Sequence, residues 1–308
     1  RVFKLTPITK KIIWGGTRLS TEYGKGINGE SIAESWELTC RNDGDNIIIG
    51  GKYDGKLISE YFKENPNAVS VSWDGDRFPL LIKLIDAESD LSIQVHPDDD
   101  YAAEHTTDLG KTEMWYIVDA APDAKIIYGL KDKYTREQIQ EAIEKGTLEE
   151  LMNYVPVKAG ECYFIPAGMV HAICHGILIA EIQQNSNTTY RVYDYNRRQP
   201  DGSLRQLHVQ QALDVIERFD PNAIVSDTNG DIIANCAFFT VRAFASTTTK
   251  LIEATAKSFV HILCVDGKGT LRYGMNEMTI SKGESVFVPA GMGSMILDAE
   301  GSFVTTTL

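Results

Sequence analysis

One twelve-residue phrase occurs twice, and this internal repeat constrains the fold more than any other feature of the chain. Residues 160–171 read GECYFIPAGMVH, and residues 283–294 read GESVFVPAGMGS. A repeat of this kind indicates a duplicated folding unit. The copies differ at their last position, which is His171 in the first and Ser294 in the second. We therefore expect two units of one fold, of which only the first carries chemistry.

The duplication extends towards the N-terminus. Residues 113–120, EMWYIVDA, align with residues 260–267, VHILCVDG, at a separation of 147 residues. The separation is 123 in the later match, so the first copy holds 24 additional residues. The segment 131–154 has that length and a helical pattern, which predicts a helical insertion. The second copy has Val260 in place of Glu113, and it has therefore lost both polar groups together.

The pattern of apolar residues predicts a mainly β chain with few helices. Short segments rich in Ile, Val, Phe and Tyr, bounded by turn residues, are typical of sandwiches or barrels. The predicted strands are 46–49, 78–85, 92–96, 114–118, 125–128, 161–165, 177–183, 238–244, 259–265, 269–273 and 285–288. The predicted helices are 57–64, 135–144, 147–153 and 209–217. Thr135 with Gln138, and Thr147 with Glu150, have the spacing of a capping box.

The composition excludes partners that need a basic surface. The net charge is −13, which argues against binding to nucleic acid or to an anionic membrane. No apolar run reaches the length of about eighteen residues that a membrane-spanning helix needs. The five cysteines include no CxxC pair, which is typical of reduced thiols in a cytoplasmic protein.

The repeated phrase resembles the second sequence motif of the cupins in its spacing of Gly160, Pro166, Gly168 and His171. Pro and Gly set the turn that aims the His at the start of the next strand. The resemblance implies two cupin barrels of jelly-roll type, with the helical insertion in the first. We expect a catalytic domain at residues 1–235 and a second cupin-like domain, without metal ligands, at residues 236–308.

Four residues make a candidate metal site in the first copy. Gln94 and His96 alternate in a predicted strand and so share a face, while Glu113 opens a later strand and His171 ends the repeated phrase. Imidazole and carboxylate ligands without thiolate suit Zn²⁺, Mn²⁺ or Fe²⁺. The remaining histidines are interpreted as ordinary hydrogen-bonding residues: His105, His175, His208 and His261.

Two longer stretches resemble the zinc-binding segments of the type I mannose-6-phosphate isomerases. They are residues 92–101, SIQVHPDDDY, and 110–116, GKTEMWY. Further similar segments follow in the family order: 13–16 with Trp14, 32–37 with Trp36, 78–85 with Lys83, and 187–196 with Arg191. The resemblance is closest to the short bacterial form. It implies a metal-dependent enzyme, with zinc as the expected ion, that interconverts mannose 6-phosphate and fructose 6-phosphate through an enediol.

The isomerase reaction implied by the resemblance gives the basic residues of these segments expected roles. Arg191 and Lys111 are the expected catalytic residues, Lys83 is expected to bind substrate, and which of the three holds the phosphate stays open. Trp14 and Trp36 are expected to line the substrate site, although they also fit as core aromatics.

The general base and the role of Arg191 both have alternatives. The base is a metal-bound water, Lys111, or a carboxylate such as Glu181 or Asp194. A structural ion pair between Arg191 and Asp194 is the alternative to a catalytic Arg191.

Two other functions compete with the isomerase. An Fe²⁺-dependent cupin dioxygenase usually has His-x-His where this chain has Gln94-x-His96. A sensor of sugar phosphates that binds metal without turnover has no need of Arg and Lys beside the metal. The expected partner is a small phosphorylated sugar, and the expected assembly is a monomer or weak homodimer.

Overall fold

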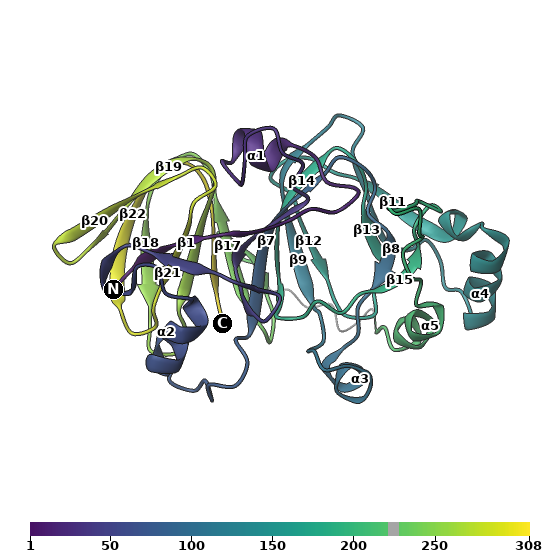
Figure 1. Ribbon diagram of the computed structural model, residues 1–308, viewed down its shortest axis with the longest axis horizontal. Helices are drawn as coiled ribbons and strands as arrows, with labels where there is room; N and C mark the ends of the chain where they lie inside the picture. Colours follow the sequence, from purple (N-terminus) through teal and green to yellow (C-terminus); the bar gives the residue numbers. More distant parts are fainter. Residues whose placement is uncertain (221–227) are drawn as a thin grey trace. The chain divides into compact units, whose positions relative to one another are not determined.

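The computed structural model describes residues 1–220 and 228–308 (Figure 1). These residues form two compact units. The first unit contains residues 1–10, 17–84 and the described C-terminal residues 228–308, and the second contains 11–16 and 85–220. Strands predominate in both units, so the mainly β prediction is confirmed. Within the described ranges, no helix has the length and apolar character needed to cross a membrane.

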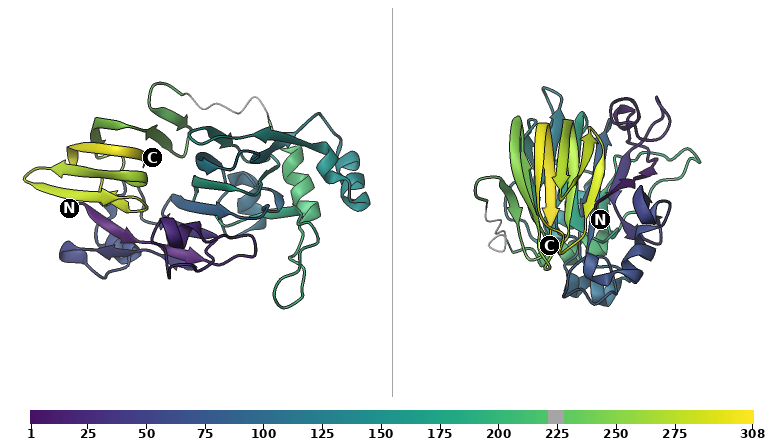
Figure 2. Two further views of the ribbon diagram at one scale, coloured as in Figure 1. Left: turned by 90° about the horizontal axis from the view of Figure 1, so that it is seen from above. Right: turned by 90° about the vertical axis from the view of Figure 1, so that its left-hand side faces the viewer.

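A nine-stranded sheet dominates the first unit. Its strands are β1 (Phe3–Thr6), β6 (Ile47–Ile49), β16 (Ile232–Asn235), β17 (Thr240–Phe244), β18 (Thr247–Ala254), β19 (Val260–Tyr273), β20 (Asn276–Ser281), β21 (Ser285–Val288) and β22 (Gly293–Thr307). The order is β16-β17-β22-β19-β21-β1-β6, with β18 paired to β22 and β20 to β19. Figure 2 shows its yellow and light-green strands side by side. The core includes Ile262, Val286, Leu297 and Phe303, all buried.

The remaining elements of the first unit are short. They are β2 (Ile8–Lys10), β3 (Glu34–Leu38), β4 (Cys40–Arg41), β5 (Gly44–Asp45), β7 (Leu80–Ala87), α1 (Arg18–Glu22), α2 (Ile58–Glu64), η1 (Gly51–Tyr53) and η2 (Pro66–Ala68). Strand β3 lies between β2 and β7, and β4 pairs with β5. The last residues of β7 belong to the second unit.

Two groups of strands form the second unit. They comprise β8 (Ile93–Val95), β9 (Glu113–Ala120), β10 (Lys125–Leu130), β11 (Met152–Pro156), β12 (Cys162–Ile165), β13 (His171–Ile173), β14 (Ile177–Gln184) and β15 (Tyr190–Tyr193). The order of one sheet is β11-β10-β13-β8-β15, and β9 lies between β12 and β14 in the other. The helices are α3 (Asp99–His105), α4 (Arg136–Lys145), η3 (Leu148–Leu151) and α5 (Val209–Glu217).

Helices α4 and α5 cover one face of the five-stranded sheet (Figure 1). Val95 of β8 packs in one core cluster with Ile139 of α4 and Leu213 of α5. Because successive residues of a strand point to opposite faces, Gln94 lies on the other face. The sheet therefore has an apolar side under the helices and a side that is free to carry polar groups.

Strand pairing confirms the internal repeat. In the first copy β12 pairs with β9, with Ile165 opposite Glu113. In the second copy β21 pairs with β19, with Val288 opposite Val260. These pairs are the same alignment positions, and β14 and β22 flank β9 and β19 on the other side. Gly168 has φ +86° and its counterpart Gly291 has φ +79°, so both copies use glycine for the left-handed turn.

The helical insertion is confirmed in part. Helix α4 has the predicted capping box of Thr135 and Gln138, and it ends at Gly146 in the left-handed conformation. The second predicted cap is wrong, because residues 148–151 form a 3₁₀ helix without a side-chain bond from Thr147. Residues 152–154 were also predicted as part of the helical segment, but they belong to β11 and pair with β10.

Two other predicted helices agree with the structure, and one predicted break between strands does not. Helix α5 occupies the predicted residues 209–217, and α2 begins one residue late. Two strands were predicted at 259–265 and 269–273, whereas β19 is continuous. The pairing of β19 with β22 shifts by one residue between Cys264 and Asp266 and then continues through the two glycines at 267 and 269.

The compact units group residues differently from the predicted domains. The N-terminal strand β1 pairs with β21, with Phe3 opposite Phe287, so the first residues belong with the second repeat. A boundary at residues 235/236 follows the sequence repeat and stays a prediction.

Candidate metal centre

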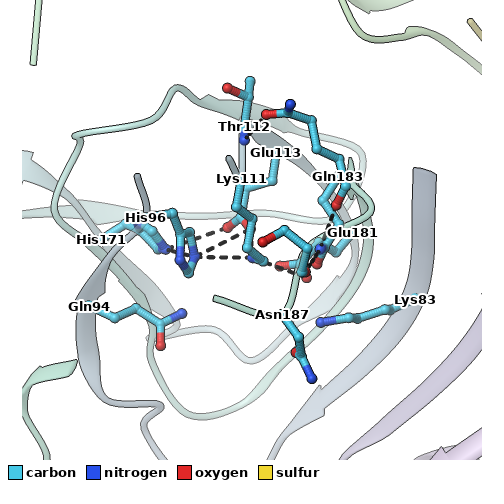
Figure 3. Close-up of polar contacts among 12 residues, drawn as sticks. Lys83, Gln94, His96, Lys111, Thr112, Glu113, His171, Glu181, Gln183 and Asn187 are labelled. Carbon is cyan, nitrogen blue, oxygen red and sulfur yellow. Dashed lines mark hydrogen bonds and ion pairs between the residues drawn. The ribbon is translucent and has the colours of Figure 1, made fainter. Parts of the chain in front are cut away.

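Three side chains that can bind a metal meet between the two sheets of the second unit. His96, Glu113 and His171 place their ligand atoms within 4.8 Å of one another (Figure 3). The Nε2 atoms of His96 and His171 are 3.1 Å apart, and the Glu113 carboxylate lies 3.6 Å from His96 Nε2 and 3.5 Å from His171 Nε2. All three side chains are buried. Two imidazoles and one carboxylate are therefore close enough together to bind a single metal ion.

Backbone carbonyls orient both imidazoles. His96 Nδ1 lies 2.9 Å from the Thr188 carbonyl oxygen, and His171 Nδ1 lies 2.8 Å from that of Met169. A carbonyl only accepts hydrogen bonds, so each Nδ1 carries the proton and each Nε2 presents its lone pair to the site. Burial lowers the pKa of His171 to about 4. The ring is therefore neutral near pH 7, as a metal ligand must be.

Gln94 and Arg191 lie level with His171 on neighbouring strands of the five-stranded sheet, and these paired residues form one row across the sheet. Across adjacent strands, Tyr128 is opposite His171, His171 is opposite Gln94, and Gln94 is opposite Arg191. Residues directly opposite in neighbouring strands share a face. Gln94 accepts a hydrogen bond from Ser92 Oγ at 3.2 Å. The row places Arg191 two strands from His171, roughly 10 Å across the sheet.

Strands β9 and β14, in the other sheet, carry a second set of polar residues near the histidines. Gln183 of β14 is opposite Glu113, and Glu181 is opposite Trp115. The Trp115 indole N–H lies 3.0 Å from both Glu113 Oε1 and Glu181 Oε2. Trp115 thus connects the two buried carboxylates.

Lys111 completes the cluster, directly before β9. Its Nζ is 3.0 Å from His96 Nε2, contacts the Glu113 carboxylate, and lies 3.9 Å from Glu181 Oε1. Figure 3 shows the Lys111 side chain beside His96 and Glu113. Lys111 lies two residues before Glu113, outside β9, and its ammonium nevertheless contacts the Glu113 carboxylate. A buried ammonium beside two carboxylates can donate a proton or stabilise negative charge.

The donor set fits a divalent metal. Two neutral imidazole nitrogens with their lone pairs facing one point, and a carboxylate beside them, are ligands that Zn²⁺, Mn²⁺ and Fe²⁺ accept. The carbonyls behind both rings fix the ring orientation that metal-binding histidines need. Gln94 lies opposite His171 in the neighbouring strand, and its amide oxygen accepts the hydrogen bond from Ser92.

Arg191 is not paired with Asp194. Among the described residues, Asp194 makes its ion pairs with Arg197 and Arg205. Arg191 donates from Nη1 to the Gln206 carbonyl at 2.9 Å, while its buried Nε has no partner. The alternative of a structural Arg191–Asp194 pair is therefore wrong.

Asp194 is a poor candidate for a general base. Burial raises the pKa of Asp194, but hydrogen bonds from Arg205 and Arg197 outweigh that effect and hold the pKa below its usual range. A carboxylate with a depressed pKa is a weak base. Glu181, which is buried and lies near Lys111 and Trp115, is better placed.

Lys83 and Trp36 belong to the first unit, while Trp14 belongs to the second. Lys83 is 4% exposed, its Nζ lies 3.5 Å from Glu34, and it is 5.7 Å from the Trp36 ring centre. Lys83 is therefore not a surface cation. Both tryptophans are buried.

Trp115 was not predicted from the sequence, and Glu181 was named only as one alternative. Trp115 follows the candidate ligand Glu113 by two residues and so shares a face of the strand with it. The period of two was the available signal. The other histidines make the predicted ordinary contacts, such as His105 with the Tyr101 carbonyl and His261 with Ser285.

The chain is similar to known isomerases over nearly its whole length. Residues 2–123 match the family described as phosphomannose isomerase type I, catalytic domain, and residues 230–308 match mannose-6-phosphate isomerase, cupin domain. A mannose-6-phosphate isomerase of Bacillus subtilis is 36% identical, over 98% of this chain and 97% of its own. One from Streptococcus mutans is also 36% identical, over 94% and 93%. The crystal structure of a mannose 6-phosphate isomerase from Bacillus subtilis superposes with a TM-score of 0.89 at 34% identity, covering 100% of this chain and 99% of that one.

Proposed function

This chain belongs to the type I mannose-6-phosphate isomerases, and from that membership and the geometry of the metal centre we propose that it interconverts mannose 6-phosphate and fructose 6-phosphate. The observation that carries the proposal is the convergence of His96, His171 and Glu113 with Lys111 beside them. An aldose–ketose isomerase moves a proton between two adjacent carbons of the open-chain sugar. It needs a Lewis acid, a base and cations close together, and this site offers groups for each.

We infer that Gln94, His96, Glu113 and His171 hold one divalent metal, and we propose Zn²⁺ because the ligands are nitrogen and oxygen. A metal held by these residues would supply a Lewis acid for the open-chain sugar. The surrounding residues hold these buried side chains in place. Trp115 holds the Glu113 carboxylate, and backbone carbonyls hold both imidazoles.

Lys111 and Glu181 are proposed to handle the proton. Their charged atoms are 3.9 Å apart in a buried site, so a proton can pass to and from a substrate carbon placed beside them. The Lys111 ammonium also lies where it can stabilise the negative charge of the enediol intermediate.

Arg191 is proposed to bind the negative charge of the substrate. Burial and the nearby Arg205 lower the pKa of Arg191, but a guanidinium stays charged at neutral pH. Its Nε has no partner in the described chain. We propose that Lys83 adds a second cation for the phosphate, and that Trp14 and Trp36 form apolar walls of the substrate site.

The architecture is proposed to be two cupin barrels, a catalytic domain at 1–235 and a second domain at 236–308. The shared pairing of β9 with β12 and of β19 with β21 supports a common fold. The second copy has Val260 and Ser294 at the two ligand positions, so it is proposed to be structural. Five free cysteines support a reducing, cytoplasmic location, and we propose a monomer or weak homodimer without nucleic acid or membrane partners.

The test is a coupled assay with purified protein, before and after chelation and after addition of Zn²⁺, Mn²⁺ or Fe²⁺. Mannose 6-phosphate should be converted to fructose 6-phosphate only by the metal-loaded protein, and glucose 6-phosphate and ribose 5-phosphate serve as comparison substrates. Anaerobic conditions should leave the rate unchanged, which separates an isomerase from an oxygenase. Substrate binding without turnover at any metal would contradict the proposal.

A further inference from the structure

The segment that carries Lys111 is a loop whose backbone is held by side chains. Residues 110–112 directly precede β9 and are not part of a strand. The Gly110 N–H donates to Asp99 Oδ1 at 2.9 Å, and the Thr112 N–H donates to Gln184 Oε1 at 2.9 Å. The Lys111 N–H between them donates to the Pro97 carbonyl at 2.9 Å. All three consecutive amides are therefore fixed, two of them by side chains.

The two side chains that hold the loop also hold each other. Gln184 Nε2 donates to both Asp99 carboxylate oxygens, at 3.0 and 3.1 Å. Gln184 is 4% exposed, and its own backbone N–H donates to the Thr112 carbonyl at 3.1 Å. The Gln184 amide therefore uses its oxygen for the loop and its nitrogen for Asp99, so neither end can turn without losing a bond.

Steric contact fixes the same loop from the other side. A β-carbon on Gly110 would lie 2.6 Å from the backbone carbon of Asp98 and from the nitrogen of Asp99, closer than atoms can approach. Beyond Gln184, Ser186 Oγ donates to the Leu109 carbonyl at 2.7 Å. The end of β14 and the start of α3 thus enclose residues 109–112.

We propose that Asp99 and Gln184 are positioning residues, which set the place of the Lys111 ammonium relative to Glu181 and the two imidazoles. The inference rests on the proposed function for its effect on turnover. Neither side chain contacts the ligand atoms of His96, Glu113 or His171. Displacement of a reacting group by about 1 Å lowers a rate by roughly a hundredfold, so loss of these bonds should reduce kcat without removing metal.

The test uses paired substitutions in the full chain. Gln184→Glu keeps the oxygen that accepts from the Thr112 N–H. It replaces the amide N–H that donates to Asp99 with a second carboxylate, which repels the Asp99 carboxylate. The kcat should therefore fall roughly tenfold or more. Adding Asp99→Asn restores a complementary pair, because the new amide can donate to Glu at 184 and still accept from Gly110. The double variant should recover to within about threefold of the wild type, which is the coupling that a double-mutant cycle measures. Gln140→Glu on the exposed face of α4 is the control for added charge.

Two further measurements separate positioning from folding. Metal content of Gln184→Glu should stay close to wild type, while kcat per folded molecule falls and KM changes little. The unfolding temperature should fall in Gln184→Glu, because two buried carboxylates oppose each other, and should recover in the double variant. Hydrogen exchange at the amides of 110–112 should be faster in Gln184→Glu and return to the wild-type rate in the double variant. Unchanged kcat and exchange in Gln184→Glu, or no recovery in the double variant, would overturn the proposal. If the wild type lacks isomerase activity, the exchange result still decides whether the pair holds the loop.

Discussion

His96 and His171 face each other with their Nε2 atoms 3.1 Å apart, while the opposite nitrogen of each ring is bonded to a backbone carbonyl. Two lone pairs directed at one point are favourable beside a cation, and the Lys111 ammonium lies 3.0 Å from His96 Nε2. The fold therefore holds both rings in the orientation that a metal needs, and this relationship underlies the first prediction.

Removal of His171 should remove the metal. His171→Ala deletes one of two imidazole ligands from a buried site, and bound metal measured by elemental analysis should fall to a small fraction of one ion per chain. His175→Ala is the matched control, because His175 is exposed and bonds to Asp90 instead. Stoichiometric metal in His171→Ala would contradict the ligand assignment.

Trp115→Phe should weaken the site without changing any proposed ligand. The substitution keeps the aromatic packing but deletes the N–H shared by Glu113 and Glu181. Residues that orient metal ligands typically contribute ten- to a hundredfold in affinity, and metal affinity measured by chelator competition should fall by about that factor. Trp73→Phe, whose indole donates to the Arg77 carbonyl in the first unit, should leave the affinity unchanged.

Arg191→Ala should retain fold and metal while kcat/KM falls by roughly a hundredfold or more, comparable to the loss of one electrostatic contact in the transition state. Arg191→Lys should recover little, because an ammonium cannot form a bidentate contact. Arg198→Ala is the control, since the Arg198 guanidinium donates to the Gly202 carbonyl of an exposed loop.

The kinetics should be measured beside circular dichroism and metal content. If Arg191→Ala unfolded the protein while activity per folded molecule stayed normal, Arg191 would be structural, even though Asp194 is already paired with Arg197 and Arg205.

His261 should make stability fall in acid. Burial, aided by the charge of Lys25, lowers the pKa of His261 to about 3, from an ordinary value of about 6.5. Between these pH values the unfolded chain binds a proton that the folded chain does not, so the free energy of unfolding decreases as pH falls through this window. The slope from one such group approaches about 1.4 kcal/mol per pH unit.

The variant His261→Gln tests this linkage. Urea unfolding across pH 4 to 8 should show a shallower loss of stability below pH 6.5 in His261→Gln than in the wild type. Above pH 7 both chains carry an uncharged side chain at this position, and their curves should run parallel. Parallel curves over the entire range would show that His261 does not titrate differently on folding.

Local features could be predicted because short-range physics decides them. The turns at Gly168 and Gly291 need a left-handed backbone that favours glycine, so the spacing of glycine and proline in the chain was enough to identify the repeat. The capping box at Thr135 needs only its own helix. The prediction of a cap at Thr147 was wrong, because residues 148–151 form a 3₁₀ helix and the residues after them pair with β10. A strand partner thus overrode the local helical preference.

The sequence by itself determined the repeat and predicted most of the strands, because periodicity and turn chemistry act within a few residues. Only the tertiary structure decided that Arg191, Gln94 and His171 share one row, that Trp115 joins Glu113 to Glu181, and that Gln184 reaches Asp99. Asp99 and Gln184 are 85 residues apart in the chain. Such contacts depend on strand order and register, which are set by the burial of whole sheets and not by the preference of any one residue.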